Sequence, residues 1–533
     1  MADLLIAAPV PAAAAARAGR GHGRAMVALA RAEAVRLVRH PLTIVAVVLF
    51  LAPWVYGLVS GSADGFPVLS DAAVDLQLVG VFALGSGALM TANLAVMRGH
   101  RHRTEEFDGT LVLPPAWRVG AVLLALGPYA MGVTLLVGVR LGILALQPGA
   151  VGRPDPFEVL TTPVAVMLFG AVGVLLGRLA RSAVAAPLVL MLIVVSMFAA
   201  LAAGALGRPW LLGLTPITPL DRAYPLPAAL VDRASGRHLV YVAGLVAVVA
   251  LLALVRSGAR RVLVPLAVAV VVTVVAGVVQ FRADPGVQRL RAEVTRDPAP
   301  AEICRQVGDA RYCALGEFEA WIPSWAAVVA GATRPAPAVA GPALVVRQRV
   351  WLVGRPDATG SFTSSADADE ERVAAWQDAD AAAGFPGAVT IGAGWGPDRA
   401  AATFAGAVAY RVMTGTALAT QRPICGARGA LLIWLVGQAT PATGRGLRAA
   451  DDSSWGAVTL SDESLLTSIA VPDRDAAPAL TLLNRPSDAT TVLVREHWAE
   501  LTAPDTPLER FGELLGVPVP AAPPAEERMT CAT

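Results

Sequence analysis

Few residues in this chain have the types and spacing that catalysis requires. The sequence contains no lysine, so all 43 basic residues are arginine. A P-loop needs a lysine to reach the β- and γ-phosphates of a nucleotide, so we expect that this chain does not hydrolyse ATP through a P-loop. No HExxH motif is present, and Glu496 beside His497 lacks the spacing of zinc ligands. The glycines at 392–396 lack the spacing of a dinucleotide-binding loop. We predict no catalytic residue, no metal site and no cofactor in this chain.

The cysteines are confined to the second half of the chain, at Cys304, Cys313, Cys425 and Cys531. This asymmetry predicts that the second half occupies an oxidising compartment. Four cysteines allow three connectivities, and we favour a 304–313 pair together with a 425–531 pair. Free buried thiols are the alternative.

The charged run at residues 98–118, RGHRHRTEEFDGTLVLPPAWR, lies between two strongly apolar segments. Thr104 is placed to cap a short helix that ends at Pro114 and Pro115. On that helix Phe107 and Leu111 share one face at i, i+4, and acidic residues rim it. The predicted docking residues for a partner protein are Glu105, Glu106, Phe107, Asp108 and Leu111. The basic residues Arg98, Arg101 and Arg103 are predicted to contact lipid headgroups. A loop that folds back on its own bundle is the alternative.

The composition indicates a membrane protein. The chain of 533 residues is 55% hydrophobic and 16% charged, whereas soluble domains carry about 25% charged residues. The mean hydropathy is +0.58. Apolar segments long enough to cross a bilayer as helices occur at about 42–60, 75–97, 119–139, 159–180, 183–206, 238–255 and 262–281. Six spans and one re-entrant segment are the alternative.

The N-terminal region divides into two parts. Residues 1–25 are rich in Ala, Pro and Gly and are predicted to be a disordered tail; the stretch lacks the basic start of a signal peptide. Residues 26–41 predict an amphipathic helix with Val27, Ala30 and Ala34 on its apolar stripe. Such a helix lies in the membrane interface. Its arginines are predicted to contact headgroups, at Arg31, Arg36 and Arg39.

Arginine asymmetry predicts the orientation of the spans. Short segments on the side of the N-terminus hold 15 arginines and those on the other side hold five. The positive-inside rule therefore predicts a cytoplasmic N-terminus. With seven spans, residues 282–533 then form an extracytoplasmic domain in an oxidising space. Its longer patterns are helical and ALVVRQRVWLVG resembles a strand, which predicts a mainly α domain with a minor β element. Residues 282–302 are interpreted as a polar linker.

Ionisable residues are rare inside the predicted spans, and Arg140 is the clearest one. Ion-coupled transporters need buried carboxylates as relays. Their apparent absence favours an external energy source over secondary transport.

Three stretches together resemble the ABC-2-type transporter permeases. RGHRHRTEEFDGTLVLPPAWR is similar to the first cytoplasmic loop of that family. MVALARAEAVRLVRHPLTIV is similar to its interfacial helix and first span, and RASGRHLVYVAGLVAVVALLAL to its sixth span. The resemblance covers about residues 25–255. The seventh span and the large C-terminal domain depart from the six-span pattern, although extended versions occur among actinobacterial permeases.

The resemblance implies a function and partners. It implies a permease subunit of an ABC transporter, expected to be an exporter. The permease would work as a homo- or heterodimer with separate ATPase subunits that hold ATP and Mg²⁺. The loop 98–118 would be the coupling helix. The alternative is a membrane-anchored sensor or assembly protein whose C-terminal domain binds a ligand or envelope partner. Neither reading involves nucleic acid.

Overall fold

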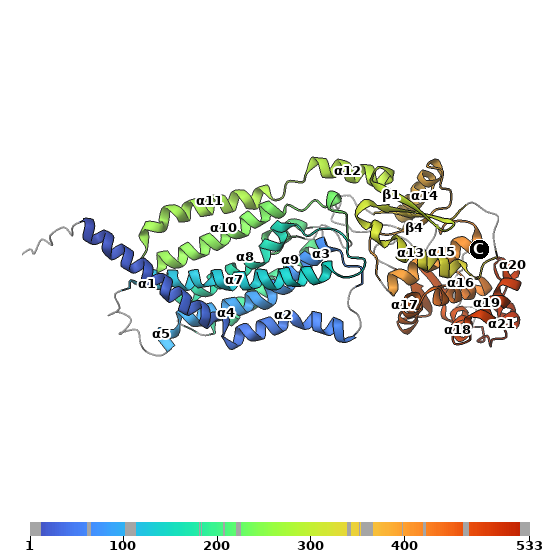
Figure 1. Cartoon of the computed structure of the whole chain (residues 1–533), viewed down its shortest axis with the longest axis horizontal. Helices are drawn as coiled ribbons and strands as arrows, with labels where there is room; N and C mark the ends of the chain where they lie inside the picture. The colour runs from blue at the N-terminus through green and yellow to red at the C-terminus, as the bar shows by residue number, and fades with distance from the viewer. Residues whose placement is uncertain are drawn as a thin grey trace, which may run out of the picture.

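The computed structural model is mainly helical and has two parts, an elongated helical bundle and a C-terminal tail domain (Figure 1). The structure describes residues 12–60, 65–101, 113–180, 182, 184–205, 208–219, 225–337, 343–350, 352, 366–396, 398–418, 423–461 and 468–522. The helix α1 and the tail domain lie at opposite ends of the bundle (Figure 1). We call these ends the loop end, where the described parts of segment 98–118 lie, and the tail end.

Seven helices of the described chain are long and apolar enough to cross a membrane. This result confirms seven full-length apolar helices rather than six and a shorter segment. They are α2 (Pro41–Ser60), the continuous unit α3–η1–α4 (Leu69–Gly80, Val81–Gly85, Ser86–Val96), α7 (Pro115–Ala145), α8 (Pro156–Leu179), α9 (Ala185–Ala205), α10 (Ser235–Arg256) and α11 (Leu263–Val279, after the 3-10 turn Arg260–Val262).

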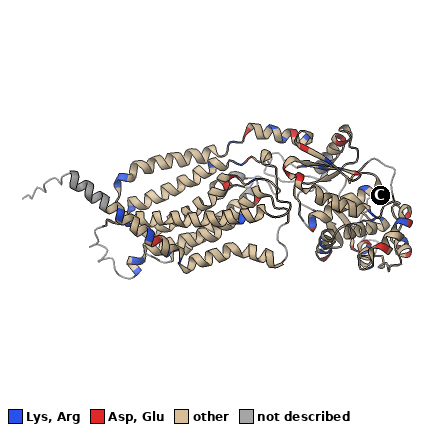
Figure 2. Ribbon diagram, in the orientation of Figure 1, with Lys and Arg blue, Asp and Glu red and all other residues tan. Residues whose placement is uncertain are grey.

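The bundle carries apolar side chains on its outside. Val48, Leu192 and Val271 are examples, each about 60% exposed. Charged residues gather at the two ends of the bundle and are sparse along its length (Figure 2). A surface of this kind is stable in lipid rather than in water. The helices α4 and α8 pack at the centre, while α2, α9 and α11 are the most exposed.

The helix α1 (Ala12–Val38) crosses the loop end of the bundle obliquely (Figure 1). Ala30, Ala34 and Leu37 are buried against the bundle, whereas Val27 and Val35 are about half exposed. The predicted stripe through Val27, Ala30 and Ala34 is therefore divided. Its alanines pack on protein, because their small side chains let the helices approach closely.

The tail domain has a small four-stranded sheet. Its strands are β1 (Glu302–Val307), β2 (Ala310–Leu315), β3 (Val345–Gln348) and β4 (Val389–Ile391), in that order. The pair β1–β2 is an antiparallel hairpin, and the other two pairs are parallel. A separate two-stranded sheet joins β5 (Ala457–Leu460) to β6 (Ile469–Pro472).

Helices make up the rest of the tail domain, as the sequence predicted. They are α12 (Pro285–Arg296), α13 (Ile322–Thr333), α14 (Ala366–Ala382), α15 (Arg399–Thr414), α16 (Gly426–Ala439), α17 (Pro441–Asp452), α18 (Asp473–Leu482), α19 (Ser487–Glu496), α20 (Trp498–Leu501) and α21 (Leu508–Leu515). The apolar helix α16 is the centre of the core, with Leu431 and Ile433 fully buried. It packs against α13, α15, α17, α18 and α21.

The tail domain and the tail end of the bundle share one hydrophobic core. Val68, Val151 and Leu230 of the bundle lie in the same cluster as the buried Trp321 and Trp325 of the tail domain. An aromatic chain extends this contact from Phe66 to Trp395, with ring centroids 6.1 Å apart. The indole Nε1 of Trp321 donates to the carbonyl oxygen of Gly149 at 2.8 Å.

The interpretation of residues 282–302 as a polar linker was wrong. Most of this segment is the amphipathic helix α12, which runs from the end of α11 to the tail domain (Figure 1). Arg291 Nε donates to the carbonyl oxygen of Leu230 at 2.7 Å, and Gln288 Nε2 donates to Asp232 at 2.6 Å. The polar residues that suggested a linker form these bonds to the bundle.

Candidate functional site

The predicted docking site is described only at its two stems. The first stem is the short helix α5 (Arg98–Arg101), and the second is the start of α7 at Pro115. Residues 102–112 lie outside the described residues. They include Arg103 and all the predicted docking residues, Glu105, Glu106, Phe107, Asp108 and Leu111.

The first stem is bonded to α1 through a buried carboxylate. Arg98 donates from both Nη atoms to Glu33, at 2.8 and 3.1 Å. Arg36 donates to the same carboxylate at 2.8 Å. Glu33 is only 5% exposed, so this planar bidentate pair fixes the position of Arg98 relative to α1. No sequence pattern indicates this pair, since its partners are 65 residues apart.

The second stem also lies against α1. The ring of Trp117, at the start of α7, is 6.0 Å from the ring of His22. One turn further along, Gly120 leaves room for the sulfur of Met26. Both stems of the loop therefore contact the same helix.

The arginines predicted to contact headgroups divide into two groups. Arg31, Arg39 and Arg101 are exposed at the loop end. Arg36 and Arg98 are bonded to Glu33 and remain partly exposed, at 58% and 40% of the side chain. Headgroup contact stays a prediction for all of them.

The second apolar helix contains a π-helical turn at Val81–Gly85. The hydroxyl of Tyr129 on α7 donates to the carbonyl oxygen of Leu84 in this turn at 3.2 Å. The side chain of Ser86 also bonds back to the carbonyl oxygen of Phe82. Turns of this type are frequent at functional sites because they interrupt the regular hydrogen-bond ladder.

The tail end of the bundle contains a buried charged cluster that the sequence reading missed. Glu158 in the first turn of α8 is 2% exposed. Its Oε1 accepts from Ser235 Oγ at 3.0 Å, and its Oε2 lies 3.6 Å from Nη1 of Arg233. Arg233 also donates to Asp71 on α3 at 2.8 Å. The prediction that buried carboxylates are absent was therefore wrong.

The sequence indicates that Glu158 lies in the first turn of a helix, but it does not indicate that the side chain is buried. Asp155 and Glu158 follow the helix-start pattern, and Asp155 caps α8 through the amide of Phe157. Acidic residues in a first turn are usually exposed and serve the helix dipole. Packing of α3 and the segment before α10 over this turn buries Glu158, which the sequence alone does not reveal.

Arg140, the ionisable residue expected in a span, lies in the second half of α7. Its guanidinium is 4.7 Å from the centre of the Trp54 ring on α2. This cation–π contact favours the charge where the surroundings are apolar.

The cysteines agree in part with the predicted pairing. Cys304 and Cys313 form a disulfide between facing positions of β1 and β2. Cys425 is also disulfide-bonded, and Cys531 lies outside the described residues. The carboxylate of Glu302 lies close to Cys304 and Cys313. Because these two sulfurs are bonded to each other, they do not supply the thiolates that a metal site would need.

The tail domain has its own buried charged cluster on the α14 side of the sheet. Arg347 donates to Glu302 at 2.8 Å and to Asp380 at 2.6 Å, and Arg349 shares Asp380. Burial raises the pKa of the Glu302 carboxyl although Arg347 opposes the shift. Each charge has an opposite partner, so the cluster fixes α14 on the sheet.

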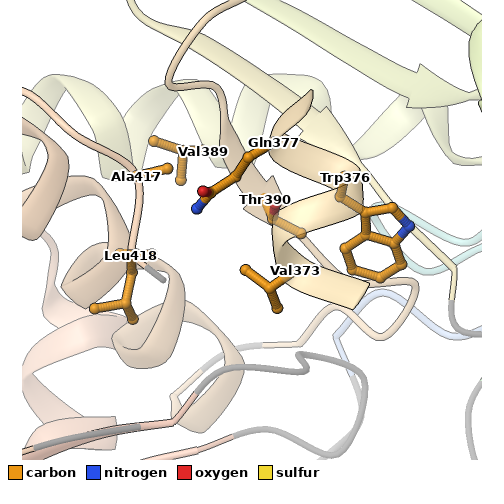
Figure 3. Close-up of a pocket in the computed structure, with 8 residues that line it drawn as sticks. Val373, Trp376, Gln377, Val389, Thr390, Ala417 and Leu418 are labelled. Atoms are coloured by element: carbon orange, nitrogen blue, oxygen red, sulfur yellow. The ribbon is translucent and has the colours of Figure 1, made fainter. Parts of the chain in front are cut away.

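A small pocket lies beside this cluster between α14, β4 and the segment 417–418 (Figure 3). Val373, Leu418 and Val389 make it mainly apolar, and Gln377 and Thr390 are its polar groups. The side chain of Trp376 points away from Leu418 and Gln377 (Figure 3). None of the described residues that line the pocket is titratable.

Comparisons with known proteins leave the family open. No family model matches the chain, and neither a curated protein nor a solved structure matches it.

Proposed function

We propose that this chain is the membrane-spanning permease subunit of an ABC transporter of the ABC-2 type. It exports its substrate, works as a dimer and is driven by a separate ATPase that docks on the loop 98–118. The observation that supports this proposal best is that both stems of the loop contact α1.

The contacts of both stems with α1 support the proposal because they can transmit force from the loop to the bundle. A partner that moves the loop must pass its displacement to the bundle through rigid contacts. Arg98 at the end of the second apolar helix is held by Glu33, and Trp117 at the start of the third lies beside His22. A push on the loop would therefore move α1, α4 and α7 together.

The helix that ends at the loop can also yield at a defined point. The π-helical turn Val81–Gly85 lies about midway along the unit Leu69–Val96. A change in its hydrogen-bond pattern would let the loop-end half move while the tail-end half stays in place.

The energy source and topology follow from the sequence. Since the chain lacks lysine, the partner supplies the P-loop, ATP and Mg²⁺. The arginine asymmetry and the cysteines support a bacterial plasma-membrane protein with the loop end in the cytoplasm and the tail domain outside.

Co-purification with the candidate ATPase tests the proposal. Phe107→Ala removes the apolar anchor and Glu106→Arg reverses a rim charge, so each is expected to weaken association by about tenfold or more. Glu293→Arg on the exposed face of α12 is the control, and it should bind as the unmodified chain does. Unchanged association and ATPase coupling in both loop variants would refute the docking site.

Thiol labelling from outside intact cells tests the topology. After mild reduction, Cys304 and Cys425 are expected to react with a membrane-impermeant reagent. Labelling that requires permeabilised cells would place the tail domain in the cytoplasm and contradict the proposed orientation.

A further inference from the structure

Among the described residues, the cluster around Glu158 holds more acidic than basic side chains. Asp71 and Glu158 both lie against Arg233, and Arg233 is closer to Asp71, at 2.8 Å, than to Glu158, at 3.6 Å. Asp155 is a further acidic neighbour of Glu158, at the start of α8. Among the described residues packed around Glu158, Arg233 is the single cation in the interactions of this carboxylate.

One oxygen of Glu158 also lacks a hydrogen bond. Its Oε1 accepts from Ser235, while Oε2 is buried and accepts no hydrogen bond. A buried ionised carboxylate in an apolar bundle is costly unless its charge is compensated. Arg233 forms an ion pair with Glu158 at 3.6 Å but shares its charge with Asp71, and Ser235 is neutral, so the compensation is incomplete.

Three buried hydroxyls on the segments that pack around Glu158 also lack partners. They belong to Thr162, Ser70 and Thr218, and each residue is at least nine-tenths buried. Thr162 stands one helical turn after Glu158 on the same face of α8. The carbonyl oxygen of Ser70 is 3.5 Å from Nη1 of Arg233.

Thr218 is joined to Glu158 through Gln77. The side chain of Gln77 accepts from the amide of Thr218 at 2.6 Å and donates to the carbonyl oxygen of Glu158 at 2.8 Å. All four segments, 70–77, 158–162, 218 and 233–235, are therefore connected. Buried polar atoms in native proteins almost always have partners, so the unpaired oxygens on these connected segments point to a bound group.

We propose that Glu158 and these hydroxyls bind one small monovalent cation, with Na⁺ as the expected ion. Carboxylate and hydroxyl oxygens are hard ligands that suit a hard cation. Asp71 and Glu158 together carry one negative charge more than Arg233 neutralises, and a single positive charge balances this buried pair. Asp71, whose side chain is 25% exposed, connects the cluster to the surface. The proposed cation site consists of bundle residues only, so cation binding does not depend on an ATPase.

Thermal unfolding of the full-length chain in detergent, without any ATPase, tests the site. Tm is measured against NaCl at constant ionic strength, with choline chloride as the replacement salt and KCl as a second arm. We expect a saturable rise of Tm with Na⁺ that choline does not produce. In Glu158→Gln the apparent affinity should fall by about tenfold to a hundredfold. Glu293→Gln makes the same chemical change on exposed α12 and should keep the wild-type response.

A hydroxyl variant and a direct binding measurement complete the test of the cation site. Thr218→Val, which removes one hydroxyl, should weaken the Na⁺ response without abolishing it. If Glu158→Gln does not fold, equilibrium dialysis of the unmodified chain with radioactive sodium replaces it, and saturable binding of one ion per chain is expected. Absence of saturable sodium binding overturns the proposal. It is also overturned if acid alone raises Tm and Na⁺ has no effect, because Glu158 would then bind only a proton.

Discussion

Replacing Gly173 by alanine should separate the two central helices of the bundle. Gly173 on α8 faces the backbone of α4, and a Cβ added there would lie 2.2 Å from the carbonyl oxygen of Leu89. No real contact is that short, and a backbone atom cannot rotate away as a side chain can. The helices must therefore move apart by more than 1 Å, judged against an ordinary contact of about 3.5 Å.

The magnitude follows from two opposing terms. Overpacking of a close contact typically costs about 1–3 kcal/mol, and a backbone clash belongs at the upper end. Alanine in place of glycine gains about 0.5–1 kcal/mol in a helix interior. The net loss expected for Gly173→Ala is about 2 kcal/mol. Separation of α4 from α8 should also weaken the bond from Asn93 Nδ2 to the carbonyl oxygen of Gly173, which is 3.3 Å long.

Two further glycines calibrate the result. A Cβ at Gly177 would lie 3.0 Å from Cβ of Val96 and 3.3 Å from the carbonyl oxygen of Asn93. These contacts are less severe than the 2.2 Å contact at Gly173, so the loss for Gly177→Ala should be smaller. Gly132→Ala on α7 meets no atom within 4 Å and should be neutral or stabilising. Thermal unfolding of the three variants in detergent measures the order. If Gly173→Ala were as stable as Gly132→Ala, the close approach of α4 and α8 would be refuted.

Three other predictions concern the loop end, the junction and the tail domain. Arg98→Gln leaves the carboxylate of Glu33 with one partner fewer and should cost about 1–3 kcal/mol; a double-mutant cycle with Glu33→Gln measures the coupling, and additive losses would contradict it. Trp321→Phe keeps the aromatic ring but removes the hydrogen bond to Gly149. It should lower the free energy of unfolding by about 1 kcal/mol, against about 3–5 kcal/mol for Trp321→Ala; equal losses would exclude a role for the ring. Burial raises the pKa of the Asp475 carboxyl above its usual value, although the amide of Gly426 opposes the shift. The folded chain therefore holds this proton more tightly than the unfolded chain, and this contribution to stability is lost as the pH rises through the raised pKa. Asp475→Asn should remove this loss, so the Tm of the variant should rise relative to that of the wild type as the pH increases from about 4; a Tm difference that does not change with pH would contradict the shift.

The sequence by itself determined the membrane-like architecture. Runs of about 20 apolar residues have one stable solution in lipid, because backbone groups must bond within the segment. The structure confirms seven such helices and a mainly helical tail domain with a minor sheet. The Cys304–Cys313 disulfide could also be predicted from the sequence, since the two cysteines are nine residues apart and flank a short loop.

Only the tertiary structure decided how distant residues meet. Glu33 and Arg98 are 65 residues apart, and Glu158 and Arg233 are each an ordinary charged residue beside an apolar run. The junction between bundle and tail domain depends on Trp321 and Gly149, which are 172 residues apart. Hydropathy reports where a segment is stable but not which segments touch. Burial of Glu158 follows from packing against α3 and the segment before α10, and that packing carries the proposed cation site.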